Sequence, residues 1–137
     1  MGVGAIIFDG DRVLLVERAG EPLKGWWSIP GGLVETGETI EQALRRETRE
    51  ETGLELEQIT RFDLFERIMR DADGRAEYHY VLVDYICKQA GGQLRAGDDV
   101  SRVEWVSVAG MGNYKVTSGT VEAVERAYEI HVRRTGA

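Results

Sequence analysis

The sequence predicts a single α/β domain in which a mixed β-sheet carries helices on both faces. Two observations support this prediction. Apolar segments of strand length are interrupted by two longer segments with helical periodicity, and turn residues separate the segments. The 137 residues are enough for one domain with a substantial core. The sequence shows no internal repeat, low-complexity segment or domain linker, so residues 1–137 are expected to form one domain.

The first predicted elements are strands. Val3–Phe8 is a continuous apolar run typical of a buried strand, and Val13–Glu17 is a second strand. The Asp-Gly pair within residues 9–12 predicts a hairpin turn, because it favours the turn types that join neighbouring strands. After a looser loop, Trp26–Ile29 is a short strand that ends at the Pro-Gly-Gly sequence of residues 30–32. Two glycines allow the backbone to turn sharply there or to approach a ligand.

A helix follows between Thr39 and Gly53. Thr39 and Gln42 have the spacing of a capping box, in which a hydroxyl and an amide satisfy backbone N–H groups at the helix start. Gly53 is a suitable end, because glycine adopts the left-handed conformation without a steric penalty.

The apolar stripe of this helix, over residues 40–44, runs into acids. Continued at helical spacing it reaches positions 47, 48 and 51, which hold Glu, Thr and Glu. With Glu50, three acids share one face, where like charges three and four residues apart repel each other. A divalent cation would turn this repulsion into attraction. The alternative interpretation is a solvated acidic face. The bases that would neutralise it are Arg45, Arg46 and Arg49.

The second half of the chain predicts more strands and one further helix. Ile59–Arg70 and Ala76–Ile86 are two long strands joined by a turn. Residues 89–99 are rich in Gly and Asp and predict a loop, after which Arg102–Val108 is the last strand. Thr120–Arg134 is an amphipathic helix with apolar residues on one side.

Composition limits the function. A formal net charge of −7 argues against a general nucleic-acid binder, and it makes an anionic substrate acceptable only if cations supply positive charge locally. The single cysteine, Cys87, excludes an internal disulfide and fits a reducing compartment. No segment is long and apolar enough to span a membrane, and no basic leader precedes the first apolar run, so a cytoplasmic protein is expected.

One segment resembles a known family. The matching pattern is a glycine, a glutamate six positions later, and then Arg-Glu-x-x-Glu-Glu-x-Gly followed by an apolar residue. The matching residues are Gly32, Glu38, Arg46, Glu47, Glu50, Glu51, Gly53 and Leu54. This pattern resembles the signature of the Nudix hydrolases. Thr48 departs from it, because the family usually has an aliphatic residue there, although the threonine methyl can still pack. The resemblance implies the α/β/α sandwich of the Nudix fold.

The resemblance also implies a divalent-metal site on this helix. Glu50 and Glu51 are the implied core ligands, and Glu47 is either a ligand or the base that activates water. Arg46 is expected to orient these carboxylates, as side chains around metal ligands commonly do. The implied cofactor is Mg²⁺, with Mn²⁺ as a possible substitute.

Further site residues are expected around this helix. The resemblance implies a metal-binding carbonyl, assigned to Gly31, and another carboxylate ahead of Trp105, assigned to Asp99. Alternatively, Asp99 and its neighbour Asp98 serve a turn. Glu38 is expected to pair with Arg46, or alternatively to contact metal through water.

Substrate contacts are predicted at three positions. Arg18, at the end of the second strand, is positioned to meet a phosphate, although an exposed arginine there is also ordinary. Trp27, or its neighbour Trp26, is a candidate for stacking on a base, with a core position as the alternative. His79 faces either a pocket or the opposite surface of the sheet.

The resemblance implies a Mg²⁺-dependent pyrophosphohydrolase that cleaves a nucleoside diphosphate derivative by attack of water at phosphorus. ADP-ribose is the expected example, because three segments resemble small ADP-ribose pyrophosphatase-like members of the family: Gly25–Gly32, His79–Tyr85 and Gly91–Trp105. Two alternatives stay open. One is a nucleoside triphosphate pyrophosphatase, including clean-up of oxidised nucleotides, and the other is a non-catalytic module that senses a nucleotide. Nucleic-acid and membrane partners are not expected. A homodimer is possible, because many members of the family are dimers.

Overall fold

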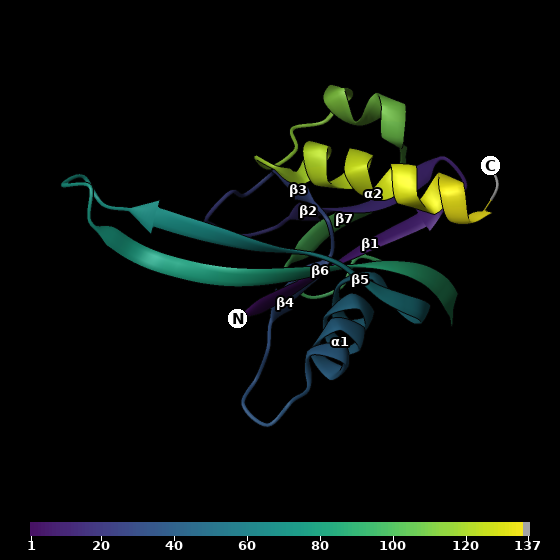
Figure 1. Ribbon diagram of the computed structural model, residues 1–137, viewed down its shortest axis with the longest axis horizontal. Coiled ribbons are helices and arrows are strands. Elements are labelled where there is room, and N and C mark those ends of the chain that lie inside the picture. Colours follow the sequence, from purple (N-terminus) through teal and green to yellow (C-terminus); the bar gives the residue numbers. More distant parts are fainter. Residues whose placement is uncertain (136–137) are drawn as a thin grey trace.

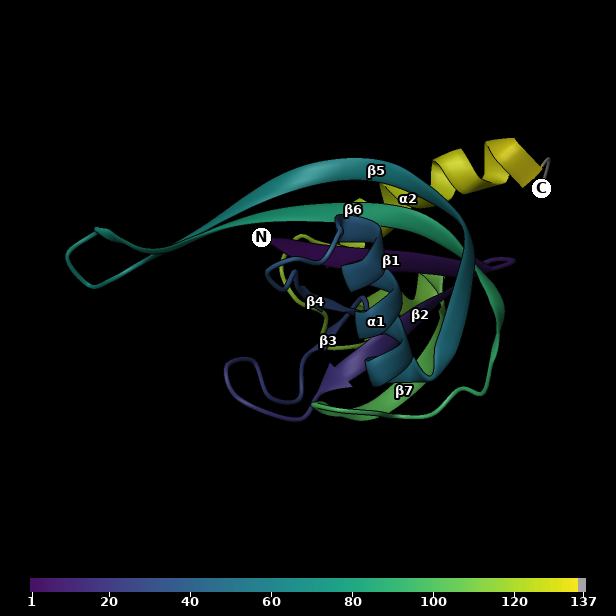
Figure 2. The same ribbon diagram turned by 90° about the horizontal axis from the view of Figure 1, so that it is seen from below.

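The structure is a computed structural model that describes residues 1–135 (Figures 1 and 2). Its elements alternate between strands and helices, as the sequence predicts. In chain order they are β1 (Gly2–Asp9), β2 (Arg12–Arg18), β3 (Trp27–Ser28), β4 (Gly31–Leu33), α1 (Ile40–Thr52), β5 (Leu54–Arg70), β6 (Ala76–Gly92), β7 (Val100–Ser107), the 3₁₀ helix η1 (Val108–Asn113) and α2 (Thr120–Thr135).

The strands form one mixed sheet of seven strands with β1 near its centre. The first half of β1 lies between β4, which is antiparallel to it, and β6, which is parallel. The end of β1 pairs with β2 across the predicted turn, and β2 pairs with β3 and β7. Among the paired strands of residues 1–135, only β1 and β6 run parallel. The predicted mixed sheet is therefore confirmed.

The two helices cover opposite faces of the sheet, as Figure 1 shows. On one face, Ala43 and Leu44 of α1 pack against Val3, Ala5 and Ile7 of β1. On the other face, Val124 and Ala127 of α2 pack in a second core with the alternate β1 residues, Ile6 and Phe8. Successive residues of a strand point to opposite faces, so one apolar run serves both cores. This is the predicted α/β/α sandwich.

Helix α1 begins and ends as predicted. The Thr39 hydroxyl accepts a hydrogen bond from the Gln42 N–H (3.1 Å), and the Gln42 side chain accepts one from the Thr39 N–H (2.8 Å). Gly53 follows the helix in the left-handed conformation, with φ 77°. These caps fix where the helix starts and stops, and therefore which of its side chains share a face.

The strands after α1 are longer than predicted. β5 begins at Leu54, directly after the helix, and β6 continues to Gly92, so the predicted loop over 89–99 begins only after Gly92. Two glycines allow this extension. A Cβ on Gly53 would overlap the Gln93 carbonyl, and a Cβ on Gly92 would overlap the Gly53 carbonyl. The backbones approach so closely that Leu54 pairs with Gly92.

Strand β4 was not predicted, because its Pro-Gly-Gly sequence is typical of a turn. The glycines instead form an edge of the sheet, with Gly31 opposite Gly4 and Gly32 opposite Val3. A Cβ on Gly31 would overlap the Val3 carbonyl, so only glycine allows this pairing.

The far end of the β5–β6 hairpin projects from the body of the domain (Figures 1 and 2). The exposed apolar side chains of β5 and β6 include Leu64, Ile68, Met69 and Tyr78. The possible homodimer stays a prediction, and this surface is a natural place to test it. Among residues 1–135, neither helix has the length and apolar character that crossing a membrane requires.

Candidate functional site

Arg46 is the centre of the site. Its guanidinium grips Glu38 with two hydrogen bonds, from Nε to Oε2 (2.6 Å) and from Nη2 to Oε1 (2.9 Å). Nη1 donates to Glu47 Oε1 (2.9 Å) and Glu50 Oε2 (3.2 Å), while Nη2 also donates to the Leu33 carbonyl (3.0 Å). A rigid planar fork suits such a set of acceptors. Arg46 therefore fixes two of the predicted site glutamates relative to β4.

Glu38 pairs with Arg46, as expected from the sequence. The Arg46 hydrogen bonds, helped by the Glu35 N–H, lower the pKa of Glu38 to about 2. The carboxylate stays charged across the physiological range and anchors the segment before α1 to the helix.

Glu47 lies against Gly32. A Cβ at Gly32 would overlap the Glu47 carboxyl group, so the motif glycine makes room for this acid. Burial raises the pKa of Glu47, and Arg46 opposes that effect. The structure thus gives Gly32 a clear physical role, which is space for a carboxylate beside the edge strand.

Glu51 is the most enclosed of the three glutamates. Its Oε1 accepts a hydrogen bond from the Gly31 N–H (2.7 Å), and burial raises its pKa to about 8. Sequence reasoning expected a metal-binding carbonyl at Gly31, and that role stays a prediction. The contact present here is made by the Gly31 N–H.

The loop over 93–99 brings a fourth acid to the helix. The N–H groups of Arg95, Gly97 and Asp98 donate to the last carbonyls of α1, those of Thr52, Glu51 and Glu50, at 3.0–3.1 Å. These bonds satisfy carbonyls that a helix end leaves without partners. The next residue, Asp99, then lies close enough to Glu51 for its charge to contribute to the raised pKa of Glu51.

Arg18 also lies near Glu51, and its positive charge lowers the pKa of Glu51. The Arg18 Nε donates to the Pro22 carbonyl (2.9 Å), which holds the side chain near the loop after β2. The Asp99 carbonyl accepts a hydrogen bond from the Ala19 N–H (3.0 Å), so Arg18 and Asp99 are fixed side by side.

Two predicted substrate contacts do not join this group. Trp27 is only 4% exposed, with the Tyr114 ring at 5.3 Å and Arg102 over its face, so it has no free face for a base and its assignment is corrected to the core. The half-buried Trp26 is the better candidate. His79 lies on the projecting hairpin, exposed and paired with Glu66 (2.7 Å), so the structure does not bring it to the glutamates.

Thr48 is buried like the aliphatic residue that the family usually has at this position, but it also carries a hydroxyl group there. Its side chain is fully buried in α1, but its hydroxyl is a buried group without a hydrogen-bond partner in the described chain. An aliphatic residue would fill this space without that cost.

Sequence reasoning missed Asp84, a half-buried acid in β6. Burial raises its pKa to about 6. The signal was present in the strand, because Asp84 stands between Leu82 and Ile86 on one face where the alternation predicts an apolar residue.

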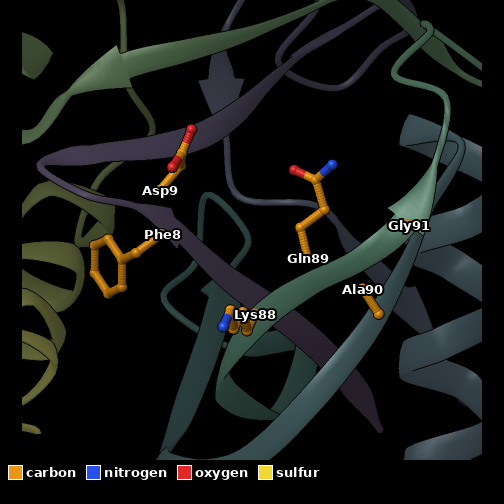
Figure 3. Close-up of a pocket in the computed structure, with 6 residues that line it drawn as sticks. All are labelled: Phe8, Asp9, Lys88, Gln89, Ala90 and Gly91. Carbon is orange, nitrogen blue, oxygen red and sulfur yellow. The ribbon is translucent and has the colours of Figure 1, made fainter. Parts of the chain in front are cut away.

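A small cleft of about 280 Å³ lies at the other end of β1 from this site (Figure 3). Asp9 and Gln89 stand on its two sides, and Phe8 turns toward α2. None of the predicted site residues lines this cleft, so it takes no part in the site.

The donor set fits a hard divalent cation. All four acids offer carboxylate oxygens, which Mg²⁺ and Mn²⁺ prefer, and none offers the sulfur that softer metals take. In residues 1–135, no three His, Cys, Asp or Glu side chains enclose a metal position as they stand. Arg46 lies between Glu47 and Glu50 and pairs with both carboxylates.

Comparison with known proteins identifies the family. A model of the NUDIX domain matches residues 1–126. The chain belongs to the Nudix hydrolase family. Among curated relatives, an ADP-ribose pyrophosphatase of Methanocaldococcus jannaschii is 37% identical over 77% of this Nudix chain. The matched region spans only 60% of the length of that relative.

Two further similarities concern nucleotides. The nucleoside triphosphatase NudI of Escherichia coli K12 is also 37% identical, over 70% of this chain and 72% of its own length. Among solved structures, the NUDIX domain of Shewanella oneidensis NrtR in complex with ADP ribose has a TM-score of 0.77. It is 27% identical, and the match covers 93% of this chain and 85% of that one.

Proposed function

We propose that this Nudix domain is a Mg²⁺-dependent pyrophosphohydrolase that cleaves the diphosphate of a nucleoside diphosphate derivative such as ADP-ribose, by attack of water at phosphorus. The observation that carries the proposal is the gathering of four acids beside two arginines. The acids are Glu47, Glu50, Glu51 and Asp99, and the arginines are Arg18 and Arg46. A diphosphate can approach so acidic a site only with divalent cations between them.

Each residue takes a physical role in this proposal. Glu50 and Glu51 hold the metal, Asp99 adds a carboxylate from the facing loop, and Glu47 is either a further ligand or the base that accepts a proton from water. A bound divalent ion neutralises charge on the diphosphate and lowers the pKa of coordinated water. Arg46 keeps Glu47 and Glu50 within reach of a shared position while remaining bound to Glu38.

Arg18 is proposed to contact a phosphate oxygen. Its charge acts on Glu51, and its side chain is held by the Pro22 carbonyl. A guanidinium fixed beside a metal site recognises phosphate well, because its fork matches the oxygen geometry.

The identity of the substrate rests on two kinds of support. The M. jannaschii relative and the S. oneidensis complex favour ADP-ribose. The NudI relative, equally identical, favours a nucleoside triphosphate as the second candidate. The two candidates require the same metal-binding acids, so these acids do not discriminate between them.

A substrate panel with product identification tests the proposal. The purified protein is incubated with ADP-ribose, other nucleoside diphosphate derivatives and nucleoside triphosphates, in Mg²⁺ and separately in Mn²⁺. Release of AMP and ribose 5-phosphate from ADP-ribose, dependent on metal, is the expected result. Release of pyrophosphate from triphosphates at higher kcat/KM would favour the second candidate. No turnover of any diphosphate compound would instead support a non-catalytic sensing module.

A further inference from the structure

Asp84 lies in line with the proposed diphosphate site. Gly31, Gly4 and Asp84 are neighbours across β4, β1 and β6. Adjacent strands are about 4.8 Å apart, so the backbones of Gly31 and Asp84 are roughly 10 Å apart. Gly31 donates its N–H to Glu51. The row of paired residues Gly31, Gly4 and Asp84 therefore leads from Glu51 of the proposed metal site to a second acid, Asp84, on the α2 face.

The space around Asp84 is made by a missing side chain. A Cβ on Gly4 would lie 2.5 Å from Asp84 Oδ1 and 2.7 Å from Ile29 Cδ1. Glycine at this position allows the carboxyl group and the isoleucine to lie over the centre of the sheet. The neighbouring side chains of β6 on this face, Leu82 and Ile86, are apolar, so Asp84 is the exception.

The Asp84 carboxylate has no hydrogen-bond or salt-bridge partner among the residues that the structure describes. Its cross-strand neighbour Asp63 is satisfied, by Arg126 (2.9 Å) and by the Leu64 N–H (2.8 Å). A half-buried acid without a protein partner is partly desolvated, which the raised pKa of Asp84 reflects. An acceptor-only group of this kind is suited to a ligand that brings an N–H donor.

A cleft of about 540 Å³ lies on the same face, of the size that small-molecule ligands occupy. Its lining includes Leu23 and Trp26 from the segment between β2 and β3, and Arg67 and Met69 of β5. Asp84 lies beyond these lining residues, on the same face of β6, and Arg67 is close enough to it for the arginine charge to lower the pKa of Asp84.

The same cleft is tied to the proposed phosphate contact. The Arg18 N–H donates to the Trp26 carbonyl (2.9 Å), and the Gly25 N–H donates to the Arg18 carbonyl (2.9 Å). Trp26 carries Lys115 over its ring at 4.6 Å and is only half-buried, so part of the indole faces the cleft. A nucleoside with its diphosphate at Arg18 thus has an aromatic surface and an unpaired acceptor on one side of the sheet.

We infer that Asp84 is a specificity-determining residue, whose carboxylate accepts a hydrogen bond from an amino group on the base of the substrate, with Trp26 against the nucleoside. This inference rests on the proposed function. It selects adenine, which carries an amino group at position 6, over hypoxanthine, which carries a carbonyl oxygen there. A carboxylate repels that oxygen, and a site built for an N–H donor rejects analogues strongly.

The test compares ADP-ribose with its hypoxanthine analogue as substrates for three proteins. The wild type is expected to prefer ADP-ribose by about 100-fold in kcat/KM or more. Asp84→Asn is expected to reduce this preference at least about tenfold, because an amide can turn its NH₂ group toward the carbonyl. The matched control Asp63→Asn removes the neighbouring acid and keeps the wild-type preference. A preference in Asp84→Asn within twofold of wild type would overturn the inference, because a merely structural acid changes stability without changing base selection.

A binding measurement separates this inference from the proposed function. If wild type hydrolyses no diphosphate compound, the proposed function fails, and calorimetry with AMP and IMP still examines Asp84. AMP binding that is at least about tenfold tighter than IMP binding, with the difference lost in Asp84→Asn, supports the inference. Equal binding of the two monophosphates, or no binding of either at millimolar concentration, overturns it. If Asp84→Asn does not fold, AMP and IMP are titrated into wild type and Trp26→Ala instead. Trp26→Ala is then expected to bind AMP more weakly than wild type does.

Discussion

The acids on the α1 face of the sheet and the acids on the α2 face are held in opposite ways. On the α1 face, Glu38, Glu47 and Glu50 share the guanidinium of Arg46. On the α2 face, Asp63 pairs with Arg126, and Asp84 has no hydrogen-bond partner among the described residues. The carboxylates held by Arg46 are pre-positioned for a divalent cation, which can take over some of the contacts that the guanidinium makes. A group without a partner is free to accept a hydrogen bond from a neutral ligand.

The largest expected effect belongs to the α1 face. Glu51→Gln keeps an oxygen for the Gly31 N–H but removes the charge that a metal ion needs. Turnover is expected to fall about a thousandfold, which corresponds to about 4 kcal/mol of transition-state stabilisation. Above pH 8, where the Glu51 carboxyl group is charged, the metal-free fold is expected to become more stable, because a buried carboxylate is replaced by a neutral amide. Steady-state kinetics and thermal unfolding of the same samples measure both effects.

The control for that variant is Glu55→Gln, a glutamate just beyond the helix that pairs with the more exposed Arg49. It is expected to keep near wild-type turnover. Activity of Glu51→Gln within a few-fold of wild type would remove Glu51 from the proposed metal site.

The next effect tests whether Arg46 positions the glutamates. Arg46→Gln removes the fork that joins Glu38 to Glu47 and Glu50, so metal affinity is expected to fall about 10- to 100-fold. Part of the lost turnover should return at high Mg²⁺, because the ligands themselves remain. Titration of activity against Mg²⁺ measures the shift, and Arg49→Gln, which removes an exposed pair, is the matched control. An unchanged Mg²⁺ dependence would show that the carboxylates do not need Arg46.

The acids of both faces make the metal-free protein sensitive to pH. The pKa of Glu51 is raised to about 8 and that of Asp84 to about 6, above their usual values of 4.5 and 3.8. The folded state therefore binds more protons than the unfolded state in these windows, and stability decreases as pH rises. The free energy of unfolding is expected to decrease from about pH 4 to pH 8, with the Asp84 part complete soon after pH 6.

Two variants separate these contributions. Glu51→Gln should remove the pH dependence above pH 6, and Asp84→Asn should remove much of the dependence below it. Metal binding to wild type at pH 7 should release about one proton, since the ligand must be deprotonated. Calorimetry in buffers of different ionisation enthalpy measures that release. A stability that rises steadily from pH 5 to pH 8 in the metal-free protein would contradict both assignments.

The contrast between the faces also explains what the sequence could and could not predict. Helix α1 and its acids were predictable, because capping residues, helical period and motif spacing are local properties. The position of Asp99 near Glu51 is not a local property. It depends on backbone bonds from the loop over 93–99 to the end of α1.

Glycine was the main source of wrong boundaries. At Gly31 and Gly92 the sequence suggests a turn or a loop, but the missing side chains instead permit close backbone approach and continued pairing. Gly53 ends α1 as predicted and also lets β5 begin directly after the helix. Asp84 was overlooked for a related reason. The space that it occupies exists because Gly4 has no side chain, and Gly4 lies far from Asp84 in the sequence although β1 and β6 are neighbours in the sheet. Trp27 was assigned wrongly for a different reason. A tryptophan can pack in a core or stack on the base of a substrate, and only the packing around it distinguishes the two.

The smallest expected effect concerns a side chain of α1 that faces the core. Thr48 has a buried hydroxyl without a partner in the described chain, and valine has the same shape without that group. Thr48→Val is expected to raise the free energy of unfolding by about 1 kcal/mol and to leave kcat/KM unchanged, because the hydroxyl contacts none of the site acids. Chemical denaturation with urea measures this difference at fixed pH. Thr52→Val is the matched control, since the Thr52 hydroxyl donates to the Thr48 carbonyl (2.6 Å) and its loss should destabilise the helix end. Equal effects of the two substitutions would mean that the Thr48 hydroxyl has a hydrogen-bond partner in solution. Helix α1, which carries the site glutamates, would then not be destabilised by an unpaired hydroxyl at this position.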